Sequence, residues 1–238
     1  MIFLSFTNCS KETGNNNTYT VTVESERFSY VLYYGLSQSI LEPIQTILDN
    51  NYSRVLNDLG VDSIDKVTVK IWNDETAFLD NMESALGIRY PGSGGWVRGA
   101  HDIRILYRGN YTGQIVLHEF CHAVSLIVNH QFGNNPRWLW EAVATYEAGE
   151  FVDPNSLSYY VVGNFPTVAE LNSNFNTSNN KIYHVGYMIS EYIIMYWDKN
   201  SYVNLIKSNG NILHVLEITN QEFEEGWKDF VTTKYFKK

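Results

Sequence analysis

The residues best suited to do chemistry lie in the run 118–122, which reads H-E-x-x-H. The surrounding stretch 115–128 is apolar, and residues four apart lie on one face of a helix, so His118 and His122 can reach one metal ion. Zinc in hydrolytic sites takes three protein ligands and leaves a position for water, whose pKa falls to about 7. Glu119 can take the proton of that water as it attacks a carbonyl group. The motif therefore predicts two ligands and the general base of a zinc hydrolase, and a third ligand is needed.

A second helix is expected after a break in the chain at residues 131–135, with Asn135 as its cap and Pro136 in its first position. Glu141 lies about one turn into this helix, and eighteen residues separate it from His122. At this spacing the sequence resembles the gluzincins, the family of thermolysin and aminopeptidase N, because in the aminopeptidase branch the ligand glutamate follows at the same interval. The resemblance implies that Glu141 is the third zinc ligand.

The resemblance extends beyond the ligands. Residues 140–144, WEAVA, are similar to the W-x-E-G-x-A segment of that family. Over residues 20–230 the chain also resembles the small bacterial peptidases of the peptidase-MA-like group, through its strand-helix-strand opening, a candidate edge strand at 102–108 and the run YHVG at 183–186. The resemblance implies a zinc metallopeptidase that hydrolyses peptide or protein substrates, with Zn²⁺ as its cofactor.

The run YHVG supplies the candidate for stabilising the oxyanion. In aminopeptidases the tyrosine of a Y-x-x-G segment has this role, so the resemblance points to Tyr183 as a second catalytic residue. A phenol or an imidazole there would donate a hydrogen bond to the developing negative charge. Tyr187 and His184 remain alternatives, and Tyr183 can equally be a core aromatic of the helix expected at 183–197.

The chain departs from the family in two places, and it also lacks the pattern of the metzincins. Thermolysin has an aspartate four residues after its ligand glutamate, where Thr145 stands here, so support for the imidazoles must come from backbone carbonyls or from Thr145 itself. The G-x-M-x-N segment by which aminopeptidases recognise a free N-terminus is replaced by PGSGGW at 91–96, which favours an endopeptidase. Ser125 and Val128 stand where metzincins need a glycine and a third histidine, which excludes metzincin chemistry.

The alternative function is a catalytically inactive gluzincin-like surface protein that binds zinc or a peptide.

The fold expected to position these residues is α+β. Strand-forming residues run together or alternate in five segments, at 18–23, 28–34, 66–72, 96–97 and 102–108. A long amphipathic helix at 40–59 should pack on the resulting mixed sheet, and a shorter helix should begin with Asn73 as its cap. From residue 115 onward the pattern is mainly helical. A chain whose strands come first and whose helices follow is typical of an α+β domain.

One catalytic domain is expected over 18–238, with a sheet lobe at about 18–131 and a helical lobe at about 132–238. A thermolysin-like zinc cleft is expected between these two lobes. Trp96 and Arg104 either line this cleft or lie on strand surfaces, and the sequence does not decide between the two.

The N-terminal segment bears on location. Residues 1–17 hold a short apolar run, then Cys9, then a polar stretch, which resembles the end of a bacterial lipoprotein signal followed by a tether. Phe6 and Asn8 depart from the usual signal, which has Leu and a small residue at these positions. The segment favours an exported or cell-envelope lipoprotein anchored to a membrane through Cys9, and a cytoplasmic protein is the alternative.

The charge of the chain bears on its partners. A formal net charge of −9, from 17 basic against 26 acidic residues, argues against nucleic acid as a partner because phosphate binding needs a basic face. A peptide or protein substrate is the expected partner, and the oligomeric state stays open.

Overall fold

The computed structural model describes residues 20–173 and 180–236, which form two compact units. Of the described residues, the sheet unit comprises 20–57 and 62–124, and the helical unit comprises 58–61, 125–173 and 180–236. Strands occur in the first unit and helices dominate the second, so the predicted α+β class is confirmed.

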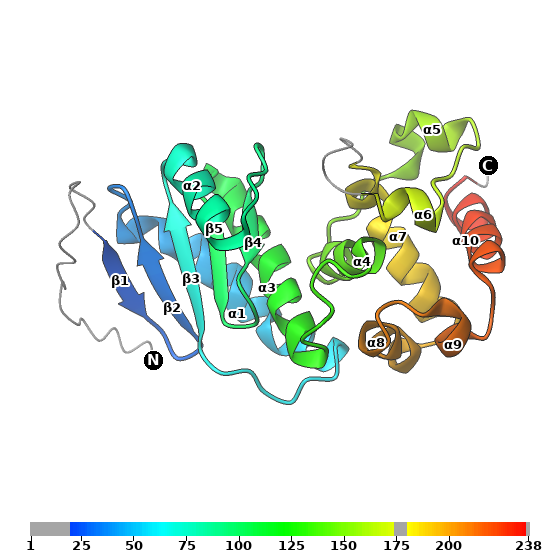
Figure 1. Cartoon of the computed structure of the whole chain (residues 1–238), viewed down its shortest axis with the longest axis horizontal. Helices are drawn as coiled ribbons and strands as arrows, with labels where there is room; N and C mark the ends of the chain where they lie inside the picture. The colour runs from blue at the N-terminus through cyan, green and yellow to red at the C-terminus, as the bar shows by residue number, and fades with distance from the viewer. Residues whose placement is uncertain (1–19, 174–179, 237–238) are drawn as a thin grey trace. The chain divides into compact units, whose positions relative to one another are not determined.

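A five-stranded mixed sheet forms the centre of the sheet unit (Figure 1). Its strands stand in the order β1 (Val21–Glu24), β2 (Phe28–Leu32), β3 (Val67–Trp72), β5 (Asp102–Leu106) and β4 (Gly95–Val97). The three inner strands are parallel, and each outer strand is antiparallel to its neighbour. Three helices belong wholly or mainly to this unit: α1 (Leu41–Asp58), α2 (Glu75–Leu86) and α3 (Thr112–Val128).

The two edge strands of the sheet are β1 and β4, and β4 is the one next to β5. The prediction of an edge strand at 102–108 is wrong, because β5 pairs with β3 on one side and with β4 on the other. The chain folds back between β4 and β5 through Gly99, whose φ of 83° suits a tight turn. Only the three residues Gly95–Val97 form β4, and so short a strand carries little signal in the sequence.

One face of the sheet is apolar and packs against α1 and α3. The residues of β3 on this face are fully buried, namely Val67, Val69 and Ile71. The ring of Phe28 on β2 lies 6.0 Å from the ring of Tyr52 on α1 and 5.5 Å from the ring of Phe120 on α3. These contacts confirm that the long helix predicted at 40–59 packs on the sheet.

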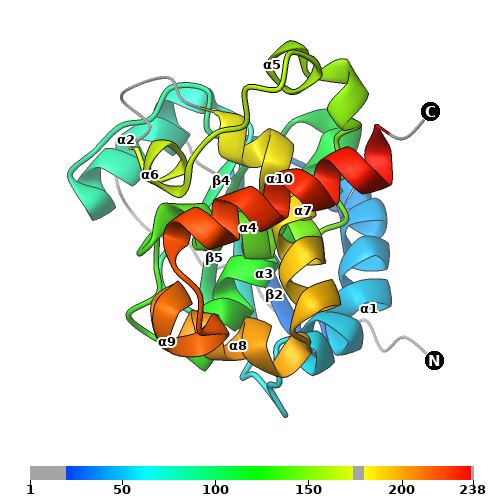
Figure 2. The ribbon, with the colours of Figure 1, turned by 90° about the vertical axis from the view of Figure 1, so that its right-hand side faces the viewer.

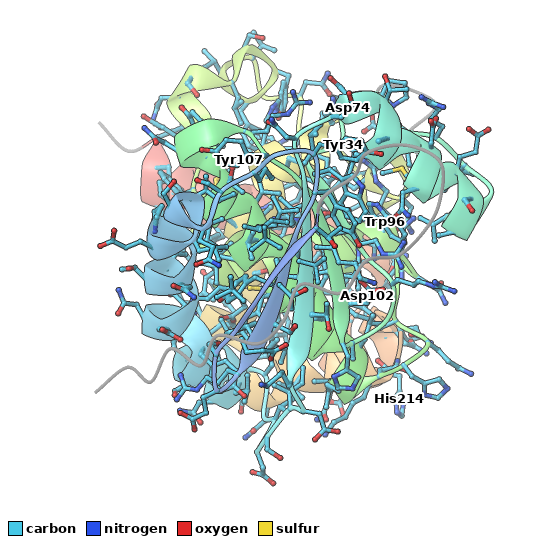
Figure 3. All side chains as sticks on the ribbon, turned by 90° about the vertical axis from the view of Figure 1, so that its left-hand side faces the viewer. Tyr34, Asp74, Trp96, Asp102, Tyr107 and His214 are labelled. Carbon is cyan, nitrogen blue, oxygen red and sulfur yellow. The ribbon has the colours of Figure 1, made fainter. Side chains whose placement is uncertain are left out.

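The opposite face of the sheet is partly covered by α2 (Figure 3). Apolar residues of the helix and of three strands form one cluster there, made of Trp72, Phe78, Leu79, Met82, Trp96 and Leu106. The guanidinium of Arg104 lies 4.6 Å from the centre of the Trp96 ring, so both residues belong to the face covered by α2 and not to the face on which α3 packs. Helix α2 begins one residue later than predicted, because the carboxylate of Asp74 and not Asn73 accepts the capping hydrogen bond from the N–H of Ala77.

A charged network ties the parallel strands together beside this cluster. Asp102 accepts hydrogen bonds from Arg104 (2.7 Å) and from Lys70 (3.1 Å), and Arg104 also donates to the side chain of Asn81 (2.6 Å). Burial alone would raise the pKa of the Asp102 carboxyl, but the hydrogen bonds and charges of Arg104 and Lys70 outweigh burial and hold this pKa below its usual value.

The substitution Asp102→Asn is expected to lower the free energy of unfolding by about 2 kcal/mol at neutral pH, since it removes charge-assisted hydrogen bonds from the buried Arg104. Because the folded-state pKa of Asp102 lies below the unfolded value of about 3.9, its stabilisation is fully present above about pH 4 and is lost as the pH falls through the folded pKa. Urea unfolding of both proteins at neutral pH and at about pH 3 measures the difference. A difference of the same size at the two pH values would contradict this interpretation.

The helical unit is built around α4 (Arg137–Glu147) and α7 (Lys181–Tyr196), which pack closely on each other (Figure 2). The other helices of the unit are α5 (Ser158–Val161), α6 (Val168–Leu171), α8 (Lys199–Lys207), α9 (Ile212–Leu216) and α10 (Asn220–Tyr235). The ring of Tyr192 on α7 lies 5.5 Å from that of Phe223 and 5.6 Å from that of Phe230, both on α10. Aromatic packing therefore holds the C-terminal helix on α7.

None of the described helices is both long enough and apolar enough to cross a membrane. The predicted lipid anchor at Cys9 lies outside the described residues.

Candidate metal centre

Helix α3 presents the two histidines of the H-E-x-x-H run from a rigid position. The helix is apolar apart from Glu119 and a few polar side chains, and its residues Phe120, Cys121 and Val124 are fully buried. At its start, a Cβ placed on Gly113 would lie 2.5 Å from the side chain of Ile47, so the glycine lets α3 approach α1. A helix packed this closely holds its side chains in fixed directions.

The rings of His118 and His122 lie one helical turn apart, with their centres 4.7 Å apart and their planes at 85° to each other. Glu141 comes from the first half of α4. The possible ligand atoms of these three residues all lie within 4.8 Å of one another. The three side chains are buried, with exposed fractions of 9% for His118 and 4% for each of the other two.

This donor set fits a metal ion. Two imidazoles and one carboxylate make up one of the three-ligand sets found in catalytic zinc sites, and imidazole and carboxylate are both ordinary zinc ligands. Buried carboxylates need an opposite charge, hydrogen bonds or a metal to offset the loss of water. The structure thus brings together the three residues that the sequence predicts as ligands, and the cluster they form is able to hold a metal.

Helix α4 begins one residue later than predicted. Pro136 has extended backbone, with φ −82° and ψ 151°, and its carbonyl accepts the hydrogen bond from the N–H of Trp140. Pro136 therefore occupies the cap position, and Asn135, the predicted cap, lies outside the helix. Glu141 still falls at the start of the second turn, because the shift is only one residue.

The backbone beneath Glu141 is held by a buried hydroxyl network. Thr145 donates its hydroxyl proton to the carbonyls of Glu141 (2.9 Å) and Ala142 (3.1 Å), on its own helix. Ser190 of α7 also donates to the carbonyl of Ala142 (2.8 Å), and the phenol of Tyr202 donates to Ser190 (2.8 Å). Thr145, one of the two alternatives for supporting the imidazoles, thus supports the backbone of the helix that carries Glu141.

A glycine sets the distance between α4 and α7. A Cβ placed on Gly186 would lie 2.5 Å from the hydroxyl oxygen of Thr145 and 2.9 Å from the Cα of Ala142. A side chain at this position would meet backbone atoms that cannot give way, so the glycine is required for the close approach of the two helices. In the sequence, this glycine ends the YHVG run.

The three oxyanion candidates on α7 have different surroundings. The ring of Tyr187 packs against the rings of Tyr146 and Phe151, with centres 5.0 and 5.4 Å apart. Nδ1 of His184 lies 3.3 Å from the phenol oxygen of Tyr159, and burial raises the pKa of Tyr159 to about 12.

Tyr183 is the candidate that contacts Arg137, the first residue of α4. The centre of its half-buried ring is 6.0 Å from the guanidinium carbon of Arg137. Since Arg137 precedes Glu141 by four residues, the two side chains share one face of α4. The contact therefore places Tyr183 beside the helix face that carries Glu141.

Gly95 is a contact residue of the site that the motifs of the sequence do not reveal. A Cβ placed on it would lie 2.8 Å from both Cγ and Oε1 of Glu119. The signal available in the sequence is the glycine pair 94–95 directly before Trp96 and Val97, since a glycine within a strand often marks a place where another chain segment comes very near.

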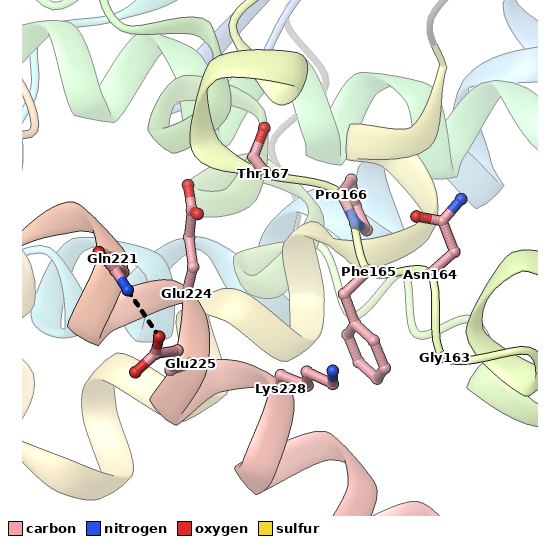
Figure 4. A pocket seen from close by; sticks show the side chains of 9 residues that line it. All are labelled: Gly163, Asn164, Phe165, Pro166, Thr167, Gln221, Glu224, Glu225 and Lys228. Atoms are coloured by element: carbon pink, nitrogen blue, oxygen red, sulfur yellow. Dashed lines mark hydrogen bonds between the residues drawn. The ribbon is translucent and has the colours of Figure 1, made fainter.

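A separate hollow of about 250 Å³ lies on the surface of the helical unit, lined by residues 163–167 and by α10 (Figure 4). The side-chain amide of Gln221 donates to Glu225 (2.9 Å), and the ammonium of Lys228 lies 6.0 Å from the ring of Phe165. The lining contains none of the residues predicted for catalysis or metal binding, so this hollow is distinct from the metal cluster.

Comparison with known proteins adds no family to this description. No protein-family model matches the chain, and no curated protein matches it either. The likeness to the gluzincins therefore stays a prediction, which rests on residues 118–122, on Glu141 and on the run 183–186.

Proposed function

We propose that the chain is a zinc-dependent peptidase in which His118, His122 and Glu141 hold the metal and Glu119 is the general base. The observation that carries the proposal is the buried cluster of the three ligand candidates, whose donor atoms lie within 4.8 Å of one another. An H-E-x-x-H run arises by chance in some sequences, and a third donor of the right type close to both histidines supports a metal site beyond what the run alone does. A zinc ion bound there would lower the pKa of water to about 7 and polarise a carbonyl group.

Glu119 is suited to the role of general base by its place on α3. It is the neighbour of His118 in the chain, and only 7% of it is exposed. Its carboxylate accepts a proton from the attacking water and delivers that proton to the amine nitrogen that leaves when the peptide C–N bond breaks. A carboxylate largely shielded from bulk water keeps a fixed direction for both transfers.

The edge strand β4 offers the substrate a backbone to pair with. Its hydrogen bonds to β5 include one from the N–H of Leu106 to the carbonyl of Gly94 (2.8 Å). In an antiparallel pair, successive residues direct their backbone N–H and C=O groups alternately toward the partner strand and away from it. The backbone groups of Gly95 and Val97 therefore face away from β5. The carbonyl of Gly95 accepts a hydrogen bond from the hydroxyl of Ser93 (2.8 Å). An extended peptide that pairs with β4 would pass beside Glu119, because Gly95 touches that side chain.

Tyr183 is the proposed oxyanion donor. Its phenol would donate a hydrogen bond to the negative charge that develops on the carbonyl oxygen, a contribution that commonly changes the rate by about 10²-fold to 10³-fold. The contact with Arg137, on the face of α4 that carries Glu141, supports this choice over His184 and Tyr187.

The test is cleavage of a mixed peptide library by the zinc-loaded protein. Internal peptide bonds are expected to be cut, the activity is expected to disappear with a chelator, and added zinc is expected to restore it, because the ligands bind the metal reversibly. A protein that binds zinc and cuts no peptide would favour the alternative of a zinc- or peptide-binding surface protein without turnover.

A further inference from the structure

Gly95 lies where the edge strand β4 contacts α3. Any other residue at this position would have to move the side chains around it. A Cβ on Gly95 would lie 2.8 Å from Cγ and Oε1 of Glu119 and 2.9 Å from Cδ1 of Ile105. Such distances are shorter than real Cβ contacts, so a side chain here must displace Glu119, Ile105 or both.

The backbone conformation does not explain this glycine. Nine glycines of the described chain have φ in the positive region that favours glycine, and Gly95 is not one of them. Gly95 lies in a regular strand, paired with Ile105 in the antiparallel ladder. Any residue could adopt its backbone angles, so the glycine is required by the space that Glu119 and Ile105 occupy.

We propose that Gly95 is a positioning residue for the general base. The missing side chain lets the carboxylate of Glu119 lie directly against the backbone of β4, which fixes its direction next to the strand along which the substrate would pair. This inference rests on the proposed function, since it gives Glu119 the role of base. A base held between a strand and a helix stays within the narrow geometry that proton transfer needs.

The matched control is the neighbouring glycine. A Cβ on Gly94 would lie 3.0 Å from Cδ1 of Ile115, the far end of a flexible side chain, and its three nearest atoms all belong to Ile115. Gly94, like Gly95, does not have positive φ. The pair Gly95→Ala and Gly94→Ala therefore adds the same methyl group at adjacent positions, and only the first has Glu119 among its nearest contacts.

Activity assays distinguish an effect on the position of Glu119 from a loss of the folded structure. Gly95→Ala is expected to reduce kcat by about 100-fold with little change in KM, because a displacement of about 1 Å at the reacting groups has an effect of this size. Gly94→Ala is expected to change kcat by less than about threefold. Zinc content and melting temperature are expected to stay close to those of the unaltered protein in both variants.

Two double variants identify the contact through which Gly95 acts. Glu119→Asp shortens the base by one methylene, so adding Gly95→Ala to it is expected to cost much less than 100-fold, since the added methyl then meets less of the side chain. Ile105→Val removes the Cδ1 atom and leaves the contact with Glu119, so the loss caused by Gly95→Ala should persist in that background. Full recovery with Ile105→Val, or an undiminished loss with Glu119→Asp, would overturn the proposal.

Crystal structures of the two glycine variants test the inference without any activity. The carboxylate of Glu119 is expected to move by about 1 Å or more in Gly95→Ala and to stay in place in Gly94→Ala, a difference large enough to alter catalysis. An unmoved Glu119 in Gly95→Ala would overturn the proposal even if the protein is a peptidase. A moved Glu119 in a protein that cuts no peptide would instead contradict the proposed function and leave the contact itself established.

Discussion

Glu119→Gln is expected to reduce peptide hydrolysis by about 10³-fold or more while zinc remains bound. Glutamine has nearly the shape of glutamate and cannot accept the proton of the attacking water, so the chemical step loses its base. The metal is unaffected because the predicted ligands are His118, His122 and Glu141, and Glu119 is not among them. Measurement of kcat/KM on a peptide from the library, together with zinc content per chain, gives both results from one preparation.

The control for this variant is Glu42→Gln, which makes the same change at an exposed glutamate in the first turn of α1. It is expected to leave both zinc content and kcat/KM unchanged. Full activity in Glu119→Gln would eliminate Glu119 as the base. Loss of zinc in that variant would mean that Glu119 is a ligand, which contradicts the proposed division of roles.

His122→Ala and Glu141→Ala are each expected to weaken zinc binding by more than about 100-fold, since even the loss of a residue that only orients a ligand costs about 10-fold to 100-fold. Each substitution also leaves two protein ligands, too few for a stable zinc site. Zinc titration against a competing chelator at neutral pH measures the affinity. Activity should fall in parallel, because the metal is lost.

Exposed histidines provide the control for the ligand variants. His130→Ala and His214→Ala remove imidazoles that are exposed and lie outside the predicted cluster, so the zinc affinity of the protein is expected to stay unchanged. If either control weakens zinc binding as much as His122→Ala does, the metal is bound elsewhere and the proposed centre is wrong.

The sequence predicts the elements of the fold well where one short segment carries the whole signal. The run at 66–72 alternates apolar and polar residues, and the structure has β3 at Val67–Trp72. The apolar positions at 40–59 recur at helical spacing, and α1 spans Leu41–Asp58. Local periodicity decides such segments because burial of one face stabilises them wherever they lie in the fold.

Strand order could not be predicted in the same way. The segment 102–108 has the composition of any half-buried strand, and only its pairing with β3 and β4 shows that it is internal. Pairing depends on segments distant in sequence, and β4 itself has only three residues. The sequence therefore predicts an edge strand at 102–108, whereas β4 is the edge beside it that we propose for substrate pairing.

The candidate site also has one part that the sequence predicts and another part that it does not. The spacing of His118, His122 and Glu141 is visible in the sequence, and the structure brings the three together. The sequence does not show the roles of Gly95 and Gly186. Each glycine leaves room for a neighbouring element, which brings Glu119 close to Gly95 and Ala142 close to Gly186. A contact of this kind involves two elements, and the sequence around either glycine describes only one of them.

The most direct test of the central claim is the position of zinc in a crystal of the zinc-loaded protein, located by anomalous diffraction at the zinc absorption edge. One strong peak per chain is expected, at about 2 Å from one nitrogen each of His118 and His122 and from a carboxylate oxygen of Glu141. A zinc peak only on other side chains, or no peak in a crystal grown with zinc, would contradict the proposed metal centre.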